Sequence, residues 1–412
     1  MEASVVTYPM TNFPIKHPSR KPMRHRFFAG ASRWLGAGAA FFGAGSGHPH
    51  ARRRVSRVLV RWCVGGLCCA SVVMESRADQ VIVRGENFTN AKVINLSNGL
   101  LRFRGHDGLF RSEYLDDVDL LIVEGGGFFD DLNEAERFLS AGQPAKAAIR
   151  YRRALQLSTG FWSDLISVRL LVAHDRAKEV DKAVQSLIRV TRSKWAGPVS
   201  GARLIPVHLP EKRNGASARA VRELDRALAA RQPEAHAVIF ETARYKLLHQ
   251  MRDQLAPGAA ARVVAHEIPE EVRSDRVYDV LASAMRTTLL AGAVSEDMLA
   301  GVDRAIAHCP QRQLADFLLL KGQMLSRKAV TREDLMRASW PFLRVAIQME
   351  NDPRAGRGLL GAVRILERLE DSTGARTLLN ECIASKHVEA ATRDQAKAML
   401  DALDVAEKSN VP

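Results

Sequence analysis

The residues that point most directly to chemistry lie in the segment GQPAKAAIRYRRALQL, residues 142–157. Three arginines flank Tyr151 in this segment: Arg150, Arg152 and Arg153. Guanidinium groups around an aromatic ring are typical of surfaces that bind phosphate or nucleic acid. The segment also fits an amphipathic helix whose arginines face solvent. The spacing of its other residues decides between these two interpretations.

Tyr151 lies four residues after Ala147 and three before Ala154, so these residues share one face of a helix. The two small residues let a second helix approach closely, and the tyrosine ring fills the space between the helices. A tyrosine packed in this way cannot stack on a base. We therefore predict that the arginines form the solvated faces of the helix. If Arg152 and Arg153 bind a ligand, an acidic protein segment fits better than a phosphate backbone.

The positive charge of the chain, +14 overall, is concentrated near its N-terminus. Residues 1–78 contain 12 Lys and Arg and two acidic residues, whereas the other 334 residues contain 48 basic and 44 acidic residues. This larger part therefore carries a net charge of +4. Binding to nucleic acid depends strongly on an excess of positive charge, and so we expect no nucleic-acid partner.

Patterns typical of enzymes and metal sites are missing from the sequence. It contains no HExxH, CxxC, P-loop or GxSxG motif. Asp116, Asp117 and Asp119 resemble a cation-binding cluster, but the glycine and distal glutamate of an EF-hand loop are missing, which favours a solvated turn. We therefore expect no catalytic residue, no cofactor and no metal. Cys309 and Cys382 are predicted to be buried thiols, with a disulfide between them as the alternative.

Residues 1–78 are predicted to be a disordered extension followed by a secretory signal. A cluster of four arginines within 52–57 precedes an apolar run at 62–74, and Ser76-Arg77-Ala78 matches the small-x-small rule for cleavage. The apolar run is shorter than the ~20 residues that span a bilayer. We predict cleavage after Ala78, export to the periplasm or cell envelope, and membrane contact only through the signal segment.

Residues 79–124 are predicted to form a small β module. Short runs alternate between apolar and polar residues there, and Asn98-Gly99 separates two of these runs. Asn-Gly favours a two-residue hairpin turn, because both positions need a positive φ. Four or five strands in this length indicate a small SH3-like or Sm-like barrel or sheet. A unit of this size is marginal alone, so we expect it to pack on the helices that follow.

The rest of the chain is rich in Ala, Leu, Arg and Glu at helical spacing, which predicts a mainly α fold. Helices are expected over 128–198 and over 218–408. A Pro- and Gly-rich stretch at 199–217 is predicted to be a linker between these two blocks.

Several of the expected helices resemble the tetratricopeptide repeat (TPR) family. The matching positions of the first unit are Ala135, Phe138, Gly142, Ala147, Tyr151 and Ala154. The spacing of the inward-facing residues of the second helix recurs first at Ala183 and Leu187. It recurs again in a C-terminal unit at Ala375, Leu379 and Cys382. Asp131 and Glu134 depart from the family, which prefers large apolar residues at those positions. The resemblance implies a helical-hairpin repeat, an α-solenoid, that follows the β module.

The resemblance also implies a function. TPR-like arrays are non-catalytic scaffolds whose helices line a groove for a protein or peptide partner. By position in the repeat, the groove candidates of the first unit are Leu132, Glu136, Leu139 and Ser140. The alternative is a cell-envelope enzyme with a site between the β module and the helical array.

Overall fold

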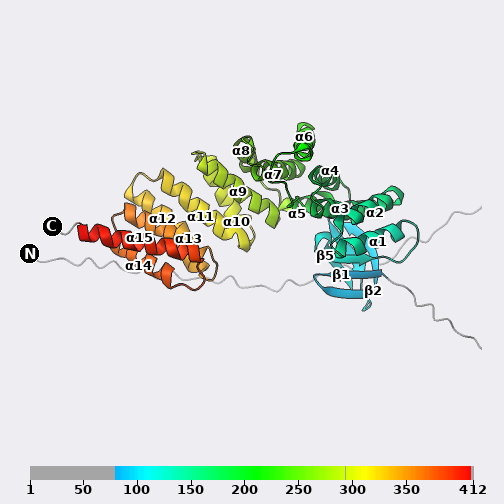
Figure 1. The fold of residues 1–412 in the computed structure, drawn as a ribbon, viewed down its shortest axis with the longest axis horizontal. Helices are drawn as coiled ribbons and strands as arrows, with labels where there is room; N and C mark the ends of the chain where they lie inside the picture. Colours follow the sequence, from blue (N-terminus) through cyan, green and yellow to red (C-terminus); the bar gives the residue numbers. More distant parts are fainter. Residues whose placement is uncertain (1–78, 293, 410–412) are drawn as a thin grey trace, which may run out of the picture. The chain divides into compact units, whose positions relative to one another are not determined.

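A computed structural model of the chain describes residues 79–292 and 294–409 (Figure 1). The predicted signal segment and its cleavage site lie outside the described residues. The described part contains five strands followed by fifteen α-helices, so it is mainly α. None of these helices is long and apolar enough to cross a membrane.

The strands form one antiparallel sheet in the order β4-β3-β2-β1-β5. Their bounds are Asp79–Val83 for β1, Glu86–Ser97 for β2, Leu100–Arg104 for β3, Phe110–Tyr114 for β4 and Val118–Ile122 for β5. The edge strands β4 and β5 do not pair with each other. Of the two predicted forms of the β module, the structure therefore shows the open sheet and not the closed barrel.

The turn between β2 and β3 is the predicted Asn-Gly turn. Asn98 has a φ of 49° and Gly99 a φ of 75°, and these left-handed angles confirm the prediction made from residue type. The turn also touches the helices, because the Gly99 amide donates to the Trp195 carbonyl at 3.2 Å. A Cβ on Gly99 would lie 2.5 Å from the Ser200 hydroxyl oxygen, so this contact requires glycine.

The first four helices pack on one another in chain order. They are α1 (Phe128–Ser140), α2 (Pro144–Leu157), α3 (Phe161–Arg176) and α4 (Val180–Thr191). Helix α1 also packs on β5, and α3 packs on β2, so the sheet lies against the helices (Figure 1). The first of two helical hairpins, α1–α2, turns at Gly142, whose φ is 70°.

The segment predicted to be a linker, 199–217, is helical and packed at its start, whereas residues 207–214 form an irregular stretch that is mostly exposed. Helix α5 (Gly197–Arg203) occupies its start, and α6 (Gly215–Ala229) begins before its end. Ala202, Leu204 and Ile205 are buried, and α5 packs against α4, α7 and α9. The linker prediction is therefore wrong for this part of the segment.

The glycines of this segment serve close packing. Gly197 has a φ of 63°, which lets the chain turn into α5. A Cβ on Gly201 would clash with the Thr191 side chain, so glycine is needed where α5 approaches α4. Composition alone cannot distinguish such glycines from those of a flexible linker.

The remaining helices continue in pairs to the end of the described region. Their bounds are α7 Glu234–Gln250, α8 Ala256–Ala265, α9 Asp275–Leu290, α10 Glu296–His308, α11 Gln311–Lys328, α12 Arg332–Gln348, α13 Ala355–Arg368, α14 Ser372–Ala384 and α15 Ala390–Ser409. Helices α9, α10 and α12 are capped at their N-termini by Ser274, Ser295 and Thr331, whose side chains accept hydrogen bonds from backbone amides of the first turn.

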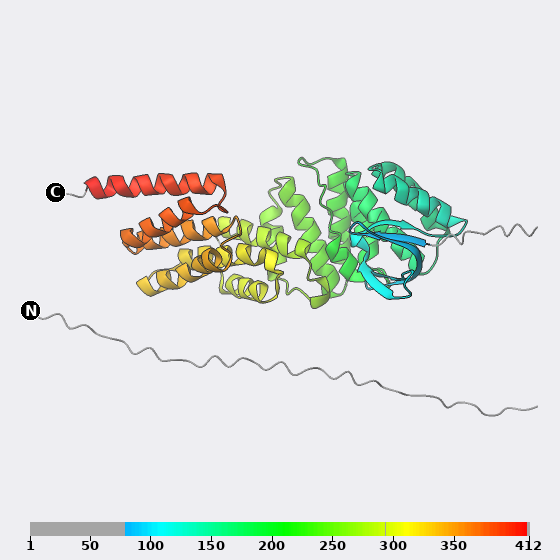
Figure 2. The same cartoon turned by 90° about the horizontal axis from the view of Figure 1, so that it is seen from below.

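The odd-numbered helices from α7 to α15 pack side by side. Among the even-numbered helices, α10 packs on α11 and α8, whereas α12 and α14 each pack between their two neighbours in sequence. Figure 2 shows this C-terminal part of the chain in yellow to red. This two-layer arrangement of consecutive hairpins is a helical repeat in the geometric sense.

Candidate binding grooves

The predicted repeat-packing positions occupy three places in the structure. Ala135, Ala147, Tyr151 and Ala154 are fully buried among α1, α2 and their neighbours, as are Ala183 and Leu187 in α4 and Ala375, Leu379 and Cys382 in α14. Phe138 is half-buried, and Gly142 is exposed in the turn between α1 and α2. Cys382 and the half-buried Cys309 are free thiols.

The predicted groove residues are not accessible, with one exception. Leu132, Glu136 and Leu139 are buried, whereas Ser140 is exposed at the end of α1. Helix α1 packs against β5, so the sheet covers a face that repeat position alone assigned to a groove. The prediction is therefore wrong for these three residues.

Glu136 instead anchors the sheet to the helices. Its carboxylate accepts hydrogen bonds from Arg169 Nε at 2.7 Å and Nη2 at 2.5 Å, and from the Tyr151 hydroxyl at 2.5 Å. It also accepts from the Leu121 amide of β5 at 3.1 Å, and Arg169 Nη1 donates to the Val118 carbonyl at 2.8 Å. The side chains of Glu136 and Arg169 are 0% and 3% exposed. This bidentate pair satisfies both charges where water is excluded.

The alternative enzyme site was predicted at this same interface. A catalytic carboxylate must reach substrate, and Glu136 is enclosed by the sheet and the helices. The acidic cluster nearby is also occupied: Arg203 pairs with Asp116 at 2.8 Å and with Asp117 at 3.2 Å, and its guanidinium lies 3.9 Å from the centre of the Tyr114 ring. Among the described residues, no group of His, Cys, Asp and Glu is arranged to hold a metal ion.

We expect Tyr151→Phe to change how stability depends on alkaline pH. Burial, and then the charge of Glu136, raises the pKa of Tyr151 well above its usual value. The unfolded tyrosine loses its proton above about pH 10, while the folded one keeps it, so the free energy of unfolding falls there by about 1.4 kcal/mol per pH unit. Urea unfolding from neutral to alkaline pH should show this component in the wild type and not in Tyr151→Phe. An identical pH slope in the two proteins contradicts the assignment.

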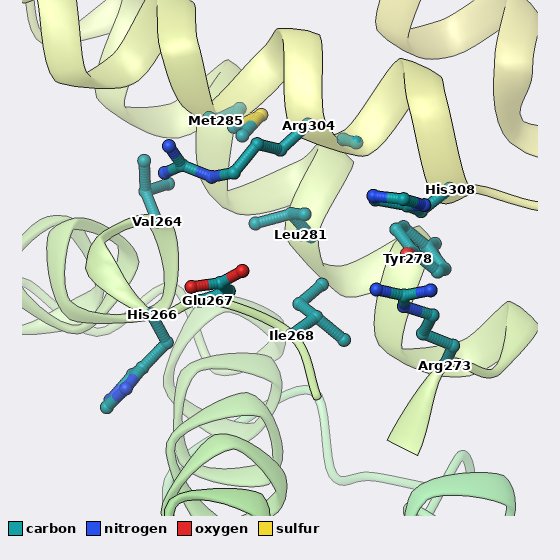
Figure 3. Close-up of a pocket in the computed structure, with 12 residues that line it drawn as sticks. Val264, His266, Glu267, Ile268, Arg273, Tyr278, Leu281, Met285, Arg304 and His308 are labelled. Atoms are coloured by element: carbon teal, nitrogen blue, oxygen red, sulfur yellow. The ribbon is translucent and has the colours of Figure 1, made fainter. Parts of the chain in front are cut away.

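A small surface cavity lies between α8, α9 and α10 (Figure 3). Figure 3 shows Tyr278, His308 and Arg273 at one end of this cavity, and Glu267 and Arg304 nearer the other. Its volume is about 30 Å³, which holds roughly two water molecules. Organic ligands need pockets of about 300 Å³ or more, so this cavity is too small for a substrate despite its polar lining.

A much larger groove crosses the odd-numbered layer, with a volume of about 630 Å³. We call it the arginine groove, because Arg286 of α9, Arg327 of α11, and Arg357 and Arg364 of α13 line it. Asp316 of α11 is the acidic residue in its lining. Phe342 of α12 and side chains of α15 complete it, so five helices contribute to one continuous surface.

The positive charges of the arginine groove are incompletely neutralised. Asp316 pairs with Arg354 at 2.6 Å, and its other oxygen lies 3.8 Å from Arg286. Arg357 pairs with Glu389 at 3.1 Å, in a half-exposed position where such pairs contribute little. Arg364 is exposed and has no hydrogen-bond or ion-pair partner in the described part of the chain. The groove therefore offers guanidinium groups to an anionic ligand.

The arginines of the 142–157 segment have divided roles. Arg150 pairs with Asp131 at 3.0 Å and with Glu134 at 3.1 Å, so it is neutralised by these two acids of α1. Arg152 and Arg153 are exposed, as the spacing predicted. Arg152 also lines a recess of about 370 Å³ between α2, α3 and α4.

No protein-family model matches the sequence, and no curated protein matches it. Solved structures similar to it include the crystal structure of yeast Tom70, with 14% sequence identity and a TM-score of 0.30. The match covers 69% of this chain and 66% of that one, so this chain spans just under two thirds of the length of that protein.

Proposed function

We propose that this protein is a non-catalytic scaffold of TPR-like hairpins that binds an acidic segment of a partner protein in the arginine groove. The observation that carries the proposal is that four arginines from three helices line one groove, while its one acidic lining residue already pairs with Arg354. Arginine holds carboxylates through paired hydrogen bonds. Rows of side chains on stacked helices are suited to a peptide, which can contact several helices at once.

An acidic protein segment fits this groove better than nucleic acid does. Binding of single strands relies on exposed aromatic rings that stack on bases. Phe342 is the aromatic residue in the groove lining, and it is buried. Glu389, the ion-pair partner of Arg357, would also repel a continuous phosphate backbone. A peptide can place its carboxylates at separate arginines and an uncharged residue next to Glu389.

We expect Arg364→Glu to weaken binding of a fluorescein-labelled Glu-rich peptide to the full-length chain by about tenfold, or about 1.4 kcal/mol. The substitution replaces an unpaired cation in the groove by an anion, and fluorescence anisotropy measures the change in Kd. Arg222→Glu, at an exposed position of α6 outside the groove, is the matched control because it changes the net charge equally.

Equal losses in the two variants would show that net charge, not the groove, binds the peptide, and this would contradict the proposal. Tighter binding of a single-stranded DNA oligonucleotide than of the peptide would favour the nucleic-acid alternative. A hydrolase screen on the same protein tests the enzyme alternative. Turnover of any substrate, combined with no protein partner in pull-down experiments, would overturn the scaffold proposal.

Export is a second part of the proposal and rests on the sequence of residues 1–78. The basic cluster, the apolar run and Ser76-Arg77-Ala78 support a signal that is cleaved after Ala78 and directs the protein to the periplasm or cell envelope. Mass spectrometry of the N-terminus of the native protein tests it. A mature protein that begins at Asp79 supports export, and one that keeps residues before Arg52 rejects it.

A further inference from the structure

A second groove lies between α10 and α12, away from the arginine groove. Both helices pack on α11, but they do not pack closely on each other. The space between them has a volume of about 1020 Å³, with α11 as its floor. We call it the α10–α12 groove. In the other layer, by contrast, α9, α11 and α13 pack directly side by side.

Large apolar side chains are exposed in this groove. Trp340 and Ile347 of α12 are 70% and 73% exposed, and their spacing of seven residues places them on the same face of the helix. Ile306 of α10 and Leu325 of α11 are half-buried and continue the apolar lining. Contiguous exposed apolar surface of this kind marks interaction sites.

The dimensions of the groove suit a helix. Two turns of an α-helix are about 11 Å long and about 10 Å wide, and a cylinder of this size occupies roughly 850 Å³. The volume of the groove, about 1020 Å³, is of the same order. Its walls are two helices, and apolar side chains at a spacing of seven are the pattern that packs against a partner helix.

The two walls carry opposite charges. The α10 wall contains Glu296, Asp297 and Asp303, and the α12 wall contains Arg337 and Arg344.

The ion pairs of the groove leave charge available on both walls. Asp303 pairs with Lys321 of the floor at 2.6 Å, and Glu296 pairs with Lys328, whereas Asp297 has no ion-pair partner among the described residues. Arg337 has a long, largely solvated contact of 3.9 Å with Glu333. A ligand in the groove therefore meets the unpaired Asp297 on one side and the arginines of α12 on the other.

We propose that the α10–α12 groove holds an amphipathic helix of a partner protein, with an apolar stripe, an acidic flank and a basic flank. The stripe covers Trp340 and Ile347. The acidic flank faces Arg337 and Arg344, and the basic flank faces the acids of α10. Because reversing a helix in a groove exchanges its left and right flanks, the charges determine the direction in which the helix lies. The proposal is independent of the arginine groove and of the substitutions that test it.

Synthetic helical peptides with one Leu stripe and three patterns of flanking charge test the proposal on the full-length chain. The first peptide has one Glu flank and one Lys flank, and the other two have only Glu or only Lys. We expect the mixed peptide to bind at least about tenfold more tightly than either of the others, by isothermal titration calorimetry. Trp340→Ala should weaken its binding by a similar factor. Leu157→Ala, which truncates an exposed apolar residue on α2, should leave binding unchanged.

A photo-crosslinker at the peptide N-terminus reports orientation. Exchanging the Glu and Lys flanks should move the crosslinks from one end of α12 to the other while the affinity stays the same. Equal binding of the three peptides, no saturable binding of any of them, or crosslinks that do not move would overturn the proposal. So would dimerisation of the chain that Trp340→Ala abolishes in analytical ultracentrifugation, because the occupant would then be a second copy of the chain.

Discussion

Replacing Arg169 by methionine is expected to lower the free energy of unfolding by about 3–5 kcal/mol. The substitution leaves the Glu136 carboxylate buried at 0% exposure without its cation, and removing one partner of a buried ion pair costs far more than the pair contributes. The Val118 carbonyl of β5 also loses its donor. The loss should therefore weaken the contact between the sheet and the helices first.

Urea unfolding measures the total effect, and hydrogen exchange at the Leu121 amide, which donates to Glu136, measures the effect on the sheet. Arg152→Met is the matched control, because Arg152 is exposed on α2, and we expect it to change stability by less than about 0.5 kcal/mol. Adding Glu136→Gln to Arg169→Met should recover part of the loss, since no unpaired charge then remains. A loss below about 1 kcal/mol for Arg169→Met would show that the network does not hold the sheet.

Replacing Phe342 by alanine is expected to cost about 3–5 kcal/mol. Phe342 of α12 is buried, and its ring fills the space above two helical glycines of the neighbouring helices, Gly322 of α11 and Gly361 of α13. A Cβ on Gly322 would lie 2.7 Å from the ring. The glycines and the ring therefore fit together, and removing the ring leaves a cavity between three helices.

Trp340→Ala is the matched control, because it removes an aromatic ring from the same helix at an exposed position. Urea unfolding should separate the two variants by several kcal/mol. Gly322→Ala alone should cost about 1–3 kcal/mol through overpacking. Combined with Phe342→Leu, it should cost less than the sum of the two single changes. Strictly additive losses would contradict the proposed fit between ring and glycine.

Local features of the sequence determined much of the secondary structure. Asn98-Gly99 predicts its turn because both residues tolerate a positive φ. The spacing of Ala147, Tyr151 and Ala154 identifies one face of a helix because the helical period is a local property of the backbone. The same periodicity predicts exposed arginines at 152 and 153, and the structure has them there. Each of these inferences uses residues within a few positions of one another.

The tertiary structure decided what covers each face. Glu136 and Arg169 are 33 residues apart, and nothing local to either shows that the other neutralises it. The sequence did contain one signal for this pair: Arg169 is a charged residue within the apolar run of α3, where a charge needs a partner. Segment 199–217 has the composition of a linker, yet Gly201 and Ala202 are buried in the packing around α5.

The two grooves also depend on the tertiary structure, because each is formed by several helices that pack together. Helical spacing predicts that α10, α11 and α12 exist, but the opening between α10 and α12 depends on how both pack on α11. The grouping of Arg286, Arg327, Arg357 and Arg364 likewise depends on three helices from distant parts of the sequence meeting in one layer. The sequence by itself determined the helices, the hairpin turn and the inward stripes, because backbone preference and side-chain period act over a few residues. Only the tertiary structure decided which charges are buried and which surfaces stay open, because burial is set by contacts between elements far apart in the chain.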